Sequence, residues 1–284
     1  MVRNEKLAAP GHHVLTFHAP DLARDSRPGH FIAVHAETGQ QILRRPFSVY
    51  TADPATGNCS ILFSVYGPST SAMAQYVPGD KIDLIGPLGG KVFTADTRPG
   101  ARHIMVGGGY GVPPLAFLTR QILAADPAAT VIFVNGARTR DFLVGTDGLD
   151  DIGATLLPAT DDGSHGYKGR VTGVLESVVS GQWTVDSEIV RSPAEAPVAS
   201  SLTTDHSPLT TNPTTIYTCG PTPMMKAVAE MAMAFDVPCQ ASLEVFMPCG
   251  IGICMGCAIP TPDGKYLRGC VEGPVFEARE IVWK

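Results

Sequence analysis

Four cysteines near the carboxyl end constrain this chain more than any other feature. Cys249, Cys254 and Cys257 are separated by four and two residues, and twelve residues lie between Cys257 and Cys270. Thiolates hold a [2Fe–2S] cluster at this spacing. Three of the intervening positions, 250, 252 and 256, are glycine, where a side chain would crowd a cluster. The sequence therefore predicts a tight loop folded around one cluster, with Cys270 as the fourth ligand.

Two other uses of these cysteines compete with the cluster. A structural zinc site usually has two pairs of cysteines, whereas this stretch has a triplet and a singleton. Unligated thiols are the second alternative, and structural disulfides are disfavoured because no secretory signal is evident. Cys59, Cys219 and Cys239 lie apart in the sequence and form no second metal motif. We therefore expect a [2Fe–2S] cluster and a reducing, cytoplasmic location.

The composition indicates an ordinary globular protein. A length of 284 residues allows two domains and a small appendage, and 44% of the residues are hydrophobic while 17% are charged. The net charge of −6 argues against nucleic acid or an anionic membrane as a partner. No apolar run reaches the roughly 18 residues that a membrane-spanning helix requires. The sequence therefore predicts neither nucleic-acid binding nor membrane insertion.

The amino-terminal third predicts a small antiparallel β-barrel. Short apolar or alternating runs are separated by turns that contain Gly and Pro, a pattern typical of barrel strands. The expected strands cover residues 13–18, 30–35, 45–50, 59–66 and 81–85, with one or two helical turns at 69–76. We assign residues 1–97 to this domain.

From residue 98 the pattern changes to alternating strands and helices. Such alternation predicts a parallel sheet covered on both faces. The expected strands are 101–106, 130–134, 154–157 and 216–218, and the expected helices are 113–125, 171–179 and 222–235, with a further helix beginning in 141–147. We assign residues 98–240 to this domain and 241–284 to the cluster segment. The expected fold class is mixed β and α/β.

Residues 192–215 differ from the rest of the second domain in composition. In this stretch 17 of 24 residues are Ser, Thr, Pro or Ala, and none is aromatic. A segment of this kind has little apolar surface to bury. We therefore expect a mobile surface insertion without activity of its own.

Residues 45–48, Arg-Pro-Phe-Ser, resemble the Arg-x-Tyr/Phe-Ser motif of the ferredoxin-reductase superfamily. The resemblance implies that Arg45 pairs with the pyrophosphate of FAD, because a guanidinium suits phosphate, and that Ser48 approaches the flavin near N5. A plain strand edge is the alternative. Residues 62–65 and 67–70 take the places of a strand and a pyrophosphate turn, although Ser69 replaces the usual second Gly. The implied FAD-binding residues are Arg45, Pro46, Phe47, Ser48, Leu62, Phe63, Ser64, Ser69 and Thr70.

Two further motifs resemble the nicotinamide dinucleotide site of the same superfamily. Residues 107–114 follow its Gly-Gly-Gly-x-Gly-x-x-Pro pattern between a strand and a helix, where bare backbone lets a pyrophosphate approach. A simple glycine turn is the alternative. Residues 217–224 match Tyr-x-Cys-Gly-Pro-x-x-Met. The implied binding residues are Gly107, Gly108, Gly109, Gly111, Cys219, Gly220 and Pro221.

Several other notable side chains are expected to have no role in chemistry. Cys219 is expected to be an uncharged thiol packed beside the nicotinamide, because nothing nearby in the sequence lowers its pKa. Phe276 is expected to fill core, with coverage of a flavin ring as the alternative. His103, His165 and His206 are expected at the surface.

The order of flavin domain, nucleotide domain and cluster segment resembles the electron-transfer subunit of class 1B dihydroorotate dehydrogenase. The resemblance covers nearly the whole chain except residues 192–215, and the segment 249–276 is its most specific part. It implies an oxidoreductase subunit that uses FAD, a [2Fe–2S] cluster and NAD(H), with no catalytic acid–base pair of its own. The implied partner is an FMN-containing subunit that oxidises dihydroorotate in de novo pyrimidine (UMP) biosynthesis, in a heterotetramer of two plus two subunits.

Two alternative functions stay open. One is the related flavoprotein subunit of sulfide dehydrogenases and bifurcating transhydrogenases, but residues 248–254 lack the Asp-Gly-Thr typical of those proteins. The other is a non-catalytic iron–sulfur redox sensor, which explains the cysteines but not the two nucleotide turns. The choice of NAD over NADP rests on the resemblance, because Arg138 and Arg140 follow the second strand, where a 2′-phosphate could bind.

Overall fold

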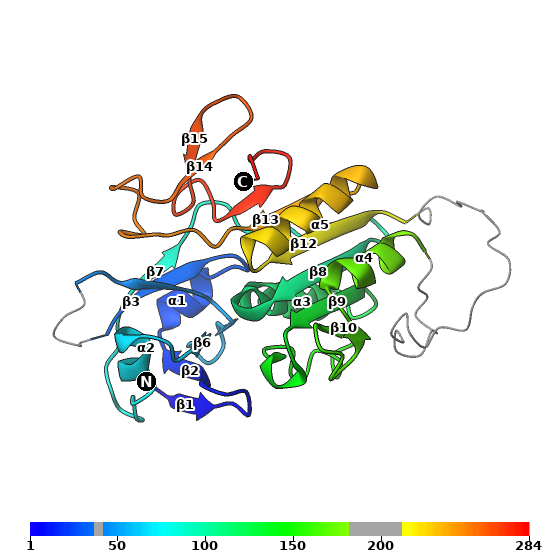
Figure 1. Ribbon diagram of the computed structural model, residues 1–284. Coiled ribbons are helices and arrows are strands. Elements are labelled where there is room, and N and C mark those ends of the chain that lie inside the picture. Colours follow the sequence, from blue (N-terminus) through cyan, green and yellow to red (C-terminus); the bar gives the residue numbers. More distant parts are fainter. Residues whose placement is uncertain (37–41, 182–211, 284) are drawn as a thin grey trace, which may run out of the picture.

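The computed structural model of this protein describes residues 1–36, 42–181 and 212–283. Two small antiparallel sheets form the amino-terminal part, and a larger sheet with helices on both faces forms the second part (Figure 1). The carboxyl-terminal segment lies against both of them (Figure 1). The expected fold class, mixed β and α/β, is confirmed.

The two amino-terminal sheets enclose one apolar core, as expected for a small barrel. One sheet has the order β1–β2–β6–β5, and the other has the order β4–β3–β7. Ile32, Ile61 and Phe63 alternate toward the core from strands of both sheets and are almost fully buried. The elements are β1 (Arg3–Lys6), β2 (His12–His18), α1 (Pro20–Asp25), β3 (Phe31–His35), β4 (Arg45–Ser48), β5 (Thr51–Asp53), β6 (Asn58–Ser64), α2 (Pro68–Met73) and β7 (Asp83–Leu88).

The larger sheet has the order β11–β10–β9–β8–β12–β13–β16. Each pair of adjacent strands is parallel except the pair β13 and β16, which is antiparallel. The expected parallel sheet is therefore confirmed and is longer than predicted. Its members are β8 (Arg102–Gly108), β9 (Thr130–Ala137), β10 (Thr155–Thr160), β11 (Tyr167–Lys168), β12 (Thr214–Cys219), β13 (Cys239–Ser242) and β16 (Val275–Glu277).

Helices cover both faces of this sheet. The helix α3 (Val112–Ala125) packs against one face, while α4 (Val171–Val179) and α5 (Thr222–Ala234) pack against the other. The strand residues are apolar on both faces because neither face meets water. Phe117 of α3 is also buried in the barrel core, so this helix joins the two domains.

The cluster segment is interleaved with the larger sheet. Its hairpin consists of β14 (Ala258–Pro260) and β15 (Tyr266–Arg268), and the chain then returns to add β16 at the sheet edge. Phe276 of β16 is 1% exposed among Met225 and Ala241, so the expectation that it fills core is confirmed. The strand β13 spans residue 241. The predicted domain boundaries, after residues 97 and 240, therefore stay predictions. β13 crosses the second boundary, and β16, which lies beyond it, belongs to the same sheet.

Two local expectations are wrong, one for a helix and one for a histidine. The helix expected to begin in 141–147 is wrong, because the chain makes only a 3₁₀ turn (Arg140–Phe142) before Gly145 takes a φ of +79° that a helix does not allow. His103 is not at the surface but 3% exposed, since it lies on a strand buried on both faces. His165 is exposed as expected, and His206 lies outside the described residues.

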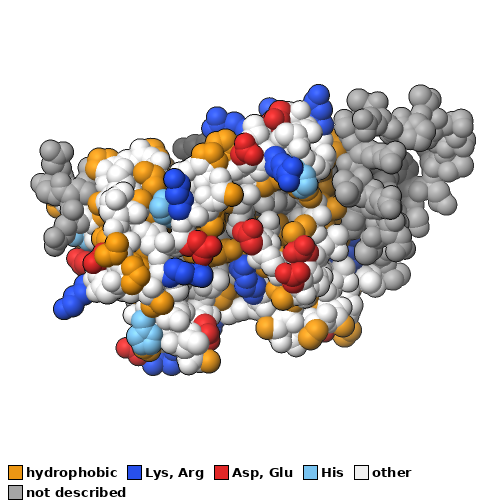
Figure 2. Space-filling model, turned by 90° about the horizontal axis from the view of Figure 1, so that it is seen from below, with side chains coloured by type: hydrophobic (Ala, Val, Ile, Leu, Met, Phe, Trp, Pro, Cys, Tyr) orange, Lys and Arg blue, Asp and Glu red, His pale blue; other side chains and the backbone are white. Residues whose placement is uncertain are grey.

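The expected insertion at 192–215 lies mostly outside the described residues. Only its last four positions are described, and Thr214 and Thr215 are already buried in β12. Within the described part of the chain no helix is long and apolar enough to cross a membrane. On the face seen in Figure 2, acidic and basic side chains are interspersed around a central hollow, and no single sign of charge dominates it.

A buried network ties the segment between the two domains to the larger sheet. The hydroxyl of Tyr217 accepts a hydrogen bond from the Asp96 backbone N–H (3.0 Å) and lies 3.3 Å from Nδ1 of His103. Burial raises the pKa of Tyr217 to about 12, so its hydroxyl stays protonated and donates to the Thr94 carbonyl oxygen (3.3 Å). The network therefore fixes the linker on the strand that carries Cys219.

Replacing Tyr217 with Phe should destabilise the fold. The change leaves the Asp96 N–H without this partner, which costs about 1–3 kcal/mol of unfolding free energy, while the Thr94 carbonyl oxygen keeps its hydrogen bond from Nε2 of Gln240 (3.1 Å). Urea unfolding of Tyr217→Phe against wild type measures the loss. Tyr266→Phe is the control, since Tyr266 is 61% exposed and should change stability little. Equal stability of the two variants would contradict a structural role for the network.

Candidate functional site

A cavity of about 420 Å³ lies between the barrel, the carboxyl edge of the larger sheet and the cluster segment. Such a volume falls in the range of small-molecule sites. All nine residues expected to bind FAD line it: Arg45, Pro46, Phe47, Ser48, Leu62, Phe63, Ser64, Ser69 and Thr70. The barrel strands β4 and β6 and the helix α2 therefore bring together three motifs that are separate in the sequence.

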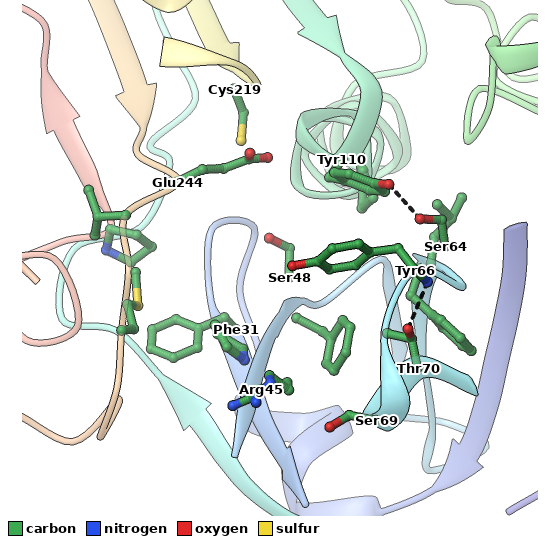
Figure 3. Close-up of a pocket in the computed structure, with 18 of the residues that line it drawn as sticks. Phe31, Arg45, Ser48, Ser64, Tyr66, Ser69, Thr70, Tyr110, Cys219 and Glu244 are labelled. Carbon is green, nitrogen blue, oxygen red and sulfur yellow. Dashed lines mark hydrogen bonds between the residues drawn. The ribbon is translucent and has the colours of Figure 1, made fainter. Parts of the chain in front are cut away.

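The cavity has distinct walls (Figure 3). Ser48 lies near its middle, with Arg45 on one side and the pair Cys219 and Glu244 on the other (Figure 3). Phe47 and Phe63 supply aromatic surface, with ring centroids 6.0 Å apart. A guanidinium, a hydroxyl and flat apolar side chains suit a phosphate-bearing ring system, so these residues fit a flavin nucleotide.

The turn before α2 is held by Thr70. Its Oγ1 accepts hydrogen bonds from the N–H groups of Tyr66 (3.0 Å) and Gly67 (3.1 Å), and the first of these is drawn in Figure 3. Ser69, which replaces the usual glycine, is only 6% exposed and leaves the turn intact. The hydroxyl of Thr70 therefore shapes the wall of the cavity by closing the turn.

Cys219 ends β12 with its sulfur toward the cavity (Figure 3). It is 2% exposed, and burial raises the pKa of its thiol well above the usual value, with the nearby Glu244 carboxyl adding to the effect. The thiol is therefore uncharged, as expected. It can pack against a ring and is not prepared to act as a nucleophile.

Glu244 is a site residue that the sequence analysis missed. It follows β13 by two residues, and its carboxyl lines the cavity beside Cys219 (Figure 3). Although solvent reaches it through the cavity, surrounding protein raises the pKa of this carboxyl to about 7. A lone acid after a short apolar run at a strand end was the sequence signal that could have identified it.

Tyr110 is the second missed residue, and it joins the two domains across the cavity. It sits in a 3₁₀ turn (Gly109–Gly111) between β8 and α3, and its hydroxyl lies 2.5 Å from Oγ of Ser64 at the end of β6 (Figure 3). An aromatic residue inside a glycine run was the available signal. This bond fixes the glycine turn relative to the barrel.

A second cavity of about 730 Å³ continues from the first along the carboxyl ends of the parallel strands. The two cavities share Ser64, Tyr110 and Glu244. Of the residues expected to bind a dinucleotide, Gly108, Gly109 and Pro221 line the second cavity, and Cys219 lines the first.

The other three residues expected at the dinucleotide site, Gly107, Gly111 and Gly220, lie behind its wall. A Cβ on Gly111 would stand 2.0 Å from the Cys219 carbonyl oxygen, and Gly220 has a φ of +146°. Their contribution is close packing between the turns after β8 and β12, which brings the lining residues into place.

The four cysteines form two pairs in the carboxyl-terminal loop. Sγ of Cys257 lies 3.3 Å from Sγ of Cys270, and both residues are buried, whereas Cys249 is half-buried beside the exposed Cys254. Within the described residues, no three Cys, His, Asp or Glu side chains are grouped closely enough to hold one metal ion. The chain thus brings the thiols near one another in pairs.

The backbone of this loop favours a thiolate at Cys249. The N–H of Ile251, followed by those of Cys254 and Ile253, lowers the pKa of Cys249 to about 6. The Gly256 N–H points at Sγ of Cys254 (3.4 Å). Burial and the neighbouring Cys257 raise the pKa of Cys270 to about 11. Four thiols in a loop whose amides point at sulfur fit an iron–sulfur cluster.

Family models match two parts of the chain. Residues 244–282 match the iron–sulfur cluster binding domain of dihydroorotate dehydrogenase B, and residues 105–230 match an oxidoreductase NAD-binding domain. The chain is 32% identical to the electron transfer subunit of dihydroorotate dehydrogenase B (NAD(+)) from Desulforamulus reducens, over 98% of this chain and 95% of that protein. It is 35% identical to the same subunit from Bacillus caldolyticus, over 99% and 96% of the two chains.

The chain belongs to the family of dihydroorotate dehydrogenase B electron transfer subunits. A solved NADH-dependent reduced ferredoxin–NADP oxidoreductase also resembles it, with a TM-score of 0.77 and 27% identity over 99% of this chain and 88% of that chain. A ferredoxin–NADP⁺ reductase from Neisseria gonorrhoeae, solved with FAD and NADP, has a TM-score of 0.55 at 16% identity and shows the common fold. The expected iron–sulfur cluster and NAD(H) agree with the two family models, and the expected FAD agrees with the flavin-containing proteins of this fold.

The raised pKa of Glu244 predicts a pH-dependent stability in this family member. The ordinary glutamate value is 4.5 and the folded value is about 7, so folding favours the protonated form. The resulting stabilisation is complete below about pH 4.5 and is lost as the pH rises through about 7.

Urea unfolding at pH 5 and pH 8 tests this dependence. Wild type should lose more stability over this interval than Glu244→Gln, which cannot ionise. Glu230→Gln, at an exposed position of α5, is the control and should behave like wild type. Parallel pH profiles for wild type and Glu244→Gln would contradict the raised pKa.

Proposed function

We propose that this chain is the electron-transfer subunit that connects a dihydroorotate-oxidising FMN subunit with NAD⁺ in de novo pyrimidine (UMP) biosynthesis. Family membership over nearly the whole chain supports the proposal. We further propose that the cavity residues of β4, β6 and α2 hold FAD, the turns after β8 and β12 hold NAD(H), and Cys249, Cys254, Cys257 and Cys270 hold the cluster.

One observation carries the proposal: the second cavity, the first cavity and the cysteine loop follow one another along one path. The dinucleotide cavity meets the flavin cavity at Ser64, Tyr110 and Glu244. Phe31 lines the other side of the flavin cavity and packs in the same apolar cluster as Cys257 and Cys270. A two-electron carrier, a flavin and a one-electron centre need this order.

FAD bound by these residues would supply the exchange of electron pairs with a nicotinamide and of single electrons with a cluster. The chain itself binds, orients and excludes water. Ser48 of β4 and Cys219 of β12 present a hydroxyl and an uncharged thiol to the cavity, so neither places a charge beside the ring. Tyr110 keeps the dinucleotide turn at a fixed position relative to the barrel.

The partner would dock on the face that carries the cysteine loop. Large apolar side chains surround this loop and are exposed without a function in the isolated chain: Phe246 (76%), Ile251 (46%), Ile253 (78%), Met255 (49%) and Tyr266 (61%). Exposed apolar groups gathered at one place favour a protein interface. An FMN-containing catalytic subunit as the occupant, a two-plus-two heterotetramer and a cytoplasmic location are parts of the proposal.

Replacing Cys254 with Ser should separate the two halves of the relay. The variant loses one proposed cluster ligand, so iron content and electron passage to the partner should fall at least about tenfold, while NADH oxidation by dyes continues. Cys239→Ser, at a buried cysteine outside the loop, is the control and should keep its iron. Full iron content and coupled activity in Cys254→Ser would contradict the assignment, and absence of NADH–dye turnover in wild type would favour a redox sensor.

Replacing Ile253 with Asp should weaken partner binding. A charge at the centre of an apolar contact raises the Kd by about tenfold or more. Val2→Asp is the control, since Val2 is 44% exposed but lies next to β1, away from the cysteine loop (Figure 1). The Kd for the catalytic subunit is measured by calorimetry. An unchanged Kd for Ile253→Asp would place the docking face elsewhere.

The similarity to the NADH-dependent ferredoxin–NADP oxidoreductase favours one alternative, a subunit of a bifurcating transhydrogenase or a related sulfide dehydrogenase. The two functions differ in the partner's substrate. Reduction of the purified complex by dihydroorotate supports the pyrimidine pathway, whereas reduction only by ferredoxin or sulfide supports the alternative.

A further inference from the structure

The far end of the second cavity has a charge pattern that the proposed function leaves unassigned. This inference rests on the proposed binding of a nicotinamide dinucleotide. The cavity crosses the sheet in the order β12, β8, β9 and β10, from Pro221 and Gly108 to Arg138 and Asp161. Its near end meets the flavin cavity, where the nicotinamide must lie, so its far end faces the adenosine half.

Three charged side chains line this far end: Arg138, Asp161 and Arg170. Arg138 follows β9, and Asp161 follows β10. The Asp161 backbone N–H donates to the Ala137 carbonyl oxygen (3.1 Å), which holds Asp161 beside the residue that precedes Arg138. Arg170 immediately precedes α4. Among the described residues, none of the three takes part in an ion pair within 4.0 Å.

Arg140, the other arginine near the end of β9, does not belong to this group. It lines a separate cavity of about 490 Å³ with His165 and Tyr167. Asp162 does not belong to it either, because its carboxylate accepts hydrogen bonds from the Ser164 N–H (2.9 Å) and Oγ (2.6 Å). The local set is therefore two cations and one anion around one end of the cavity.

We propose that Asp161 selects NAD(H) over NADP(H), and that Arg138 and Arg170 form a latent phosphate site that its charge suppresses. A carboxylate accepts a hydrogen bond from the ribose 2′-hydroxyl and repels a 2′-phosphate. Two guanidinium groups attract the same phosphate. Removing the one negative charge therefore leaves a site of charge about +2 where a dianion has to bind.

The variant Asp161→Asn tests whether Asp161 is the residue that selects NAD(H), called the selector below. Asp162→Asn is its matched control one residue away. The probes are 5′-AMP and 2′,5′-ADP, which differ only in the 2′-phosphate, and their Kd values are measured on the holoprotein by calorimetry. Asp161→Asn should improve the affinity for 2′,5′-ADP relative to 5′-AMP by about tenfold or more. Asp162→Asn should leave this ratio within about twofold of wild type.

The double variants Asp161→Asn/Arg138→Ala and Asp161→Asn/Arg170→Ala identify the phosphate site. Each should lose most of the gained affinity for 2′,5′-ADP, while Asp161→Asn/Arg140→Ala should keep it. The ratio of kcat/KM for NADPH and NADH in dye reduction should follow the binding ratio. Asp161→Ser is the second selector variant, used in the same way if the Asn variant does not fold.

The outcomes distinguish this inference from the proposed function. An unchanged ratio in Asp161→Asn and Asp161→Ser, with NADH oxidation retained, overturns the selector and leaves the dinucleotide site in place. An equal gain in relative affinity for 2′,5′-ADP in Asp162→Asn overturns it as well, because the effect would then come from the net charge of the region and not from Asp161. Failure of wild type to bind either probe or to oxidise either dinucleotide overturns both the selector and the proposed site.

Discussion

The structure depends on one constraint: parallel strands place their carboxyl ends at the same edge of a sheet. The edge formed by β8, β12 and β13 carries the glycine turn, Cys219 and Glu244 toward the barrel. Because these strands are buried on both faces, their register is fixed by packing, and the residues that follow them have little freedom. The two cavities meet at this edge, so the order of the sites follows from the sheet.

The cysteine loop is coupled to the same edge by a short stretch of chain. Between Ser242, which ends β13, and Cys249 the chain runs along the first cavity, where Glu244, Val245 and Met247 line it. It later returns as β16, which pairs with β13. The loop is therefore anchored to the sheet at both ends. Such anchoring would keep a cluster held by the proposed cysteines at a constant distance from the first cavity, as the proposed electron relay requires.

Sequence patterns predicted the elements well where burial alone sets them. The helix over residues 171–179 and the four expected strands of the parallel sheet are strongly apolar, and the structure contains all of them, whereas β11, β13 and β16 were not predicted. The helix expected from residue 141 was wrong, because Gly145 and Gly148 both take positive φ values that overrule a short polar–apolar pattern. His103 was misplaced because a single histidine carries no signal for a partner 114 residues away.

The sequence by itself determined which cofactors the chain is suited to bind. The cysteine spacing, the glycine turns and the Arg-Pro-Phe-Ser motif are local patterns, and local patterns can be recognised without knowledge of the fold. Only the tertiary structure decided which side chains share a cavity. It joined Ser64 to Tyr110 across two domains, set Glu244 beside Cys219, and separated Arg138 from Arg140 although they are two residues apart. The physical reason is that such neighbours are fixed by strand order and register, which no short stretch of sequence contains.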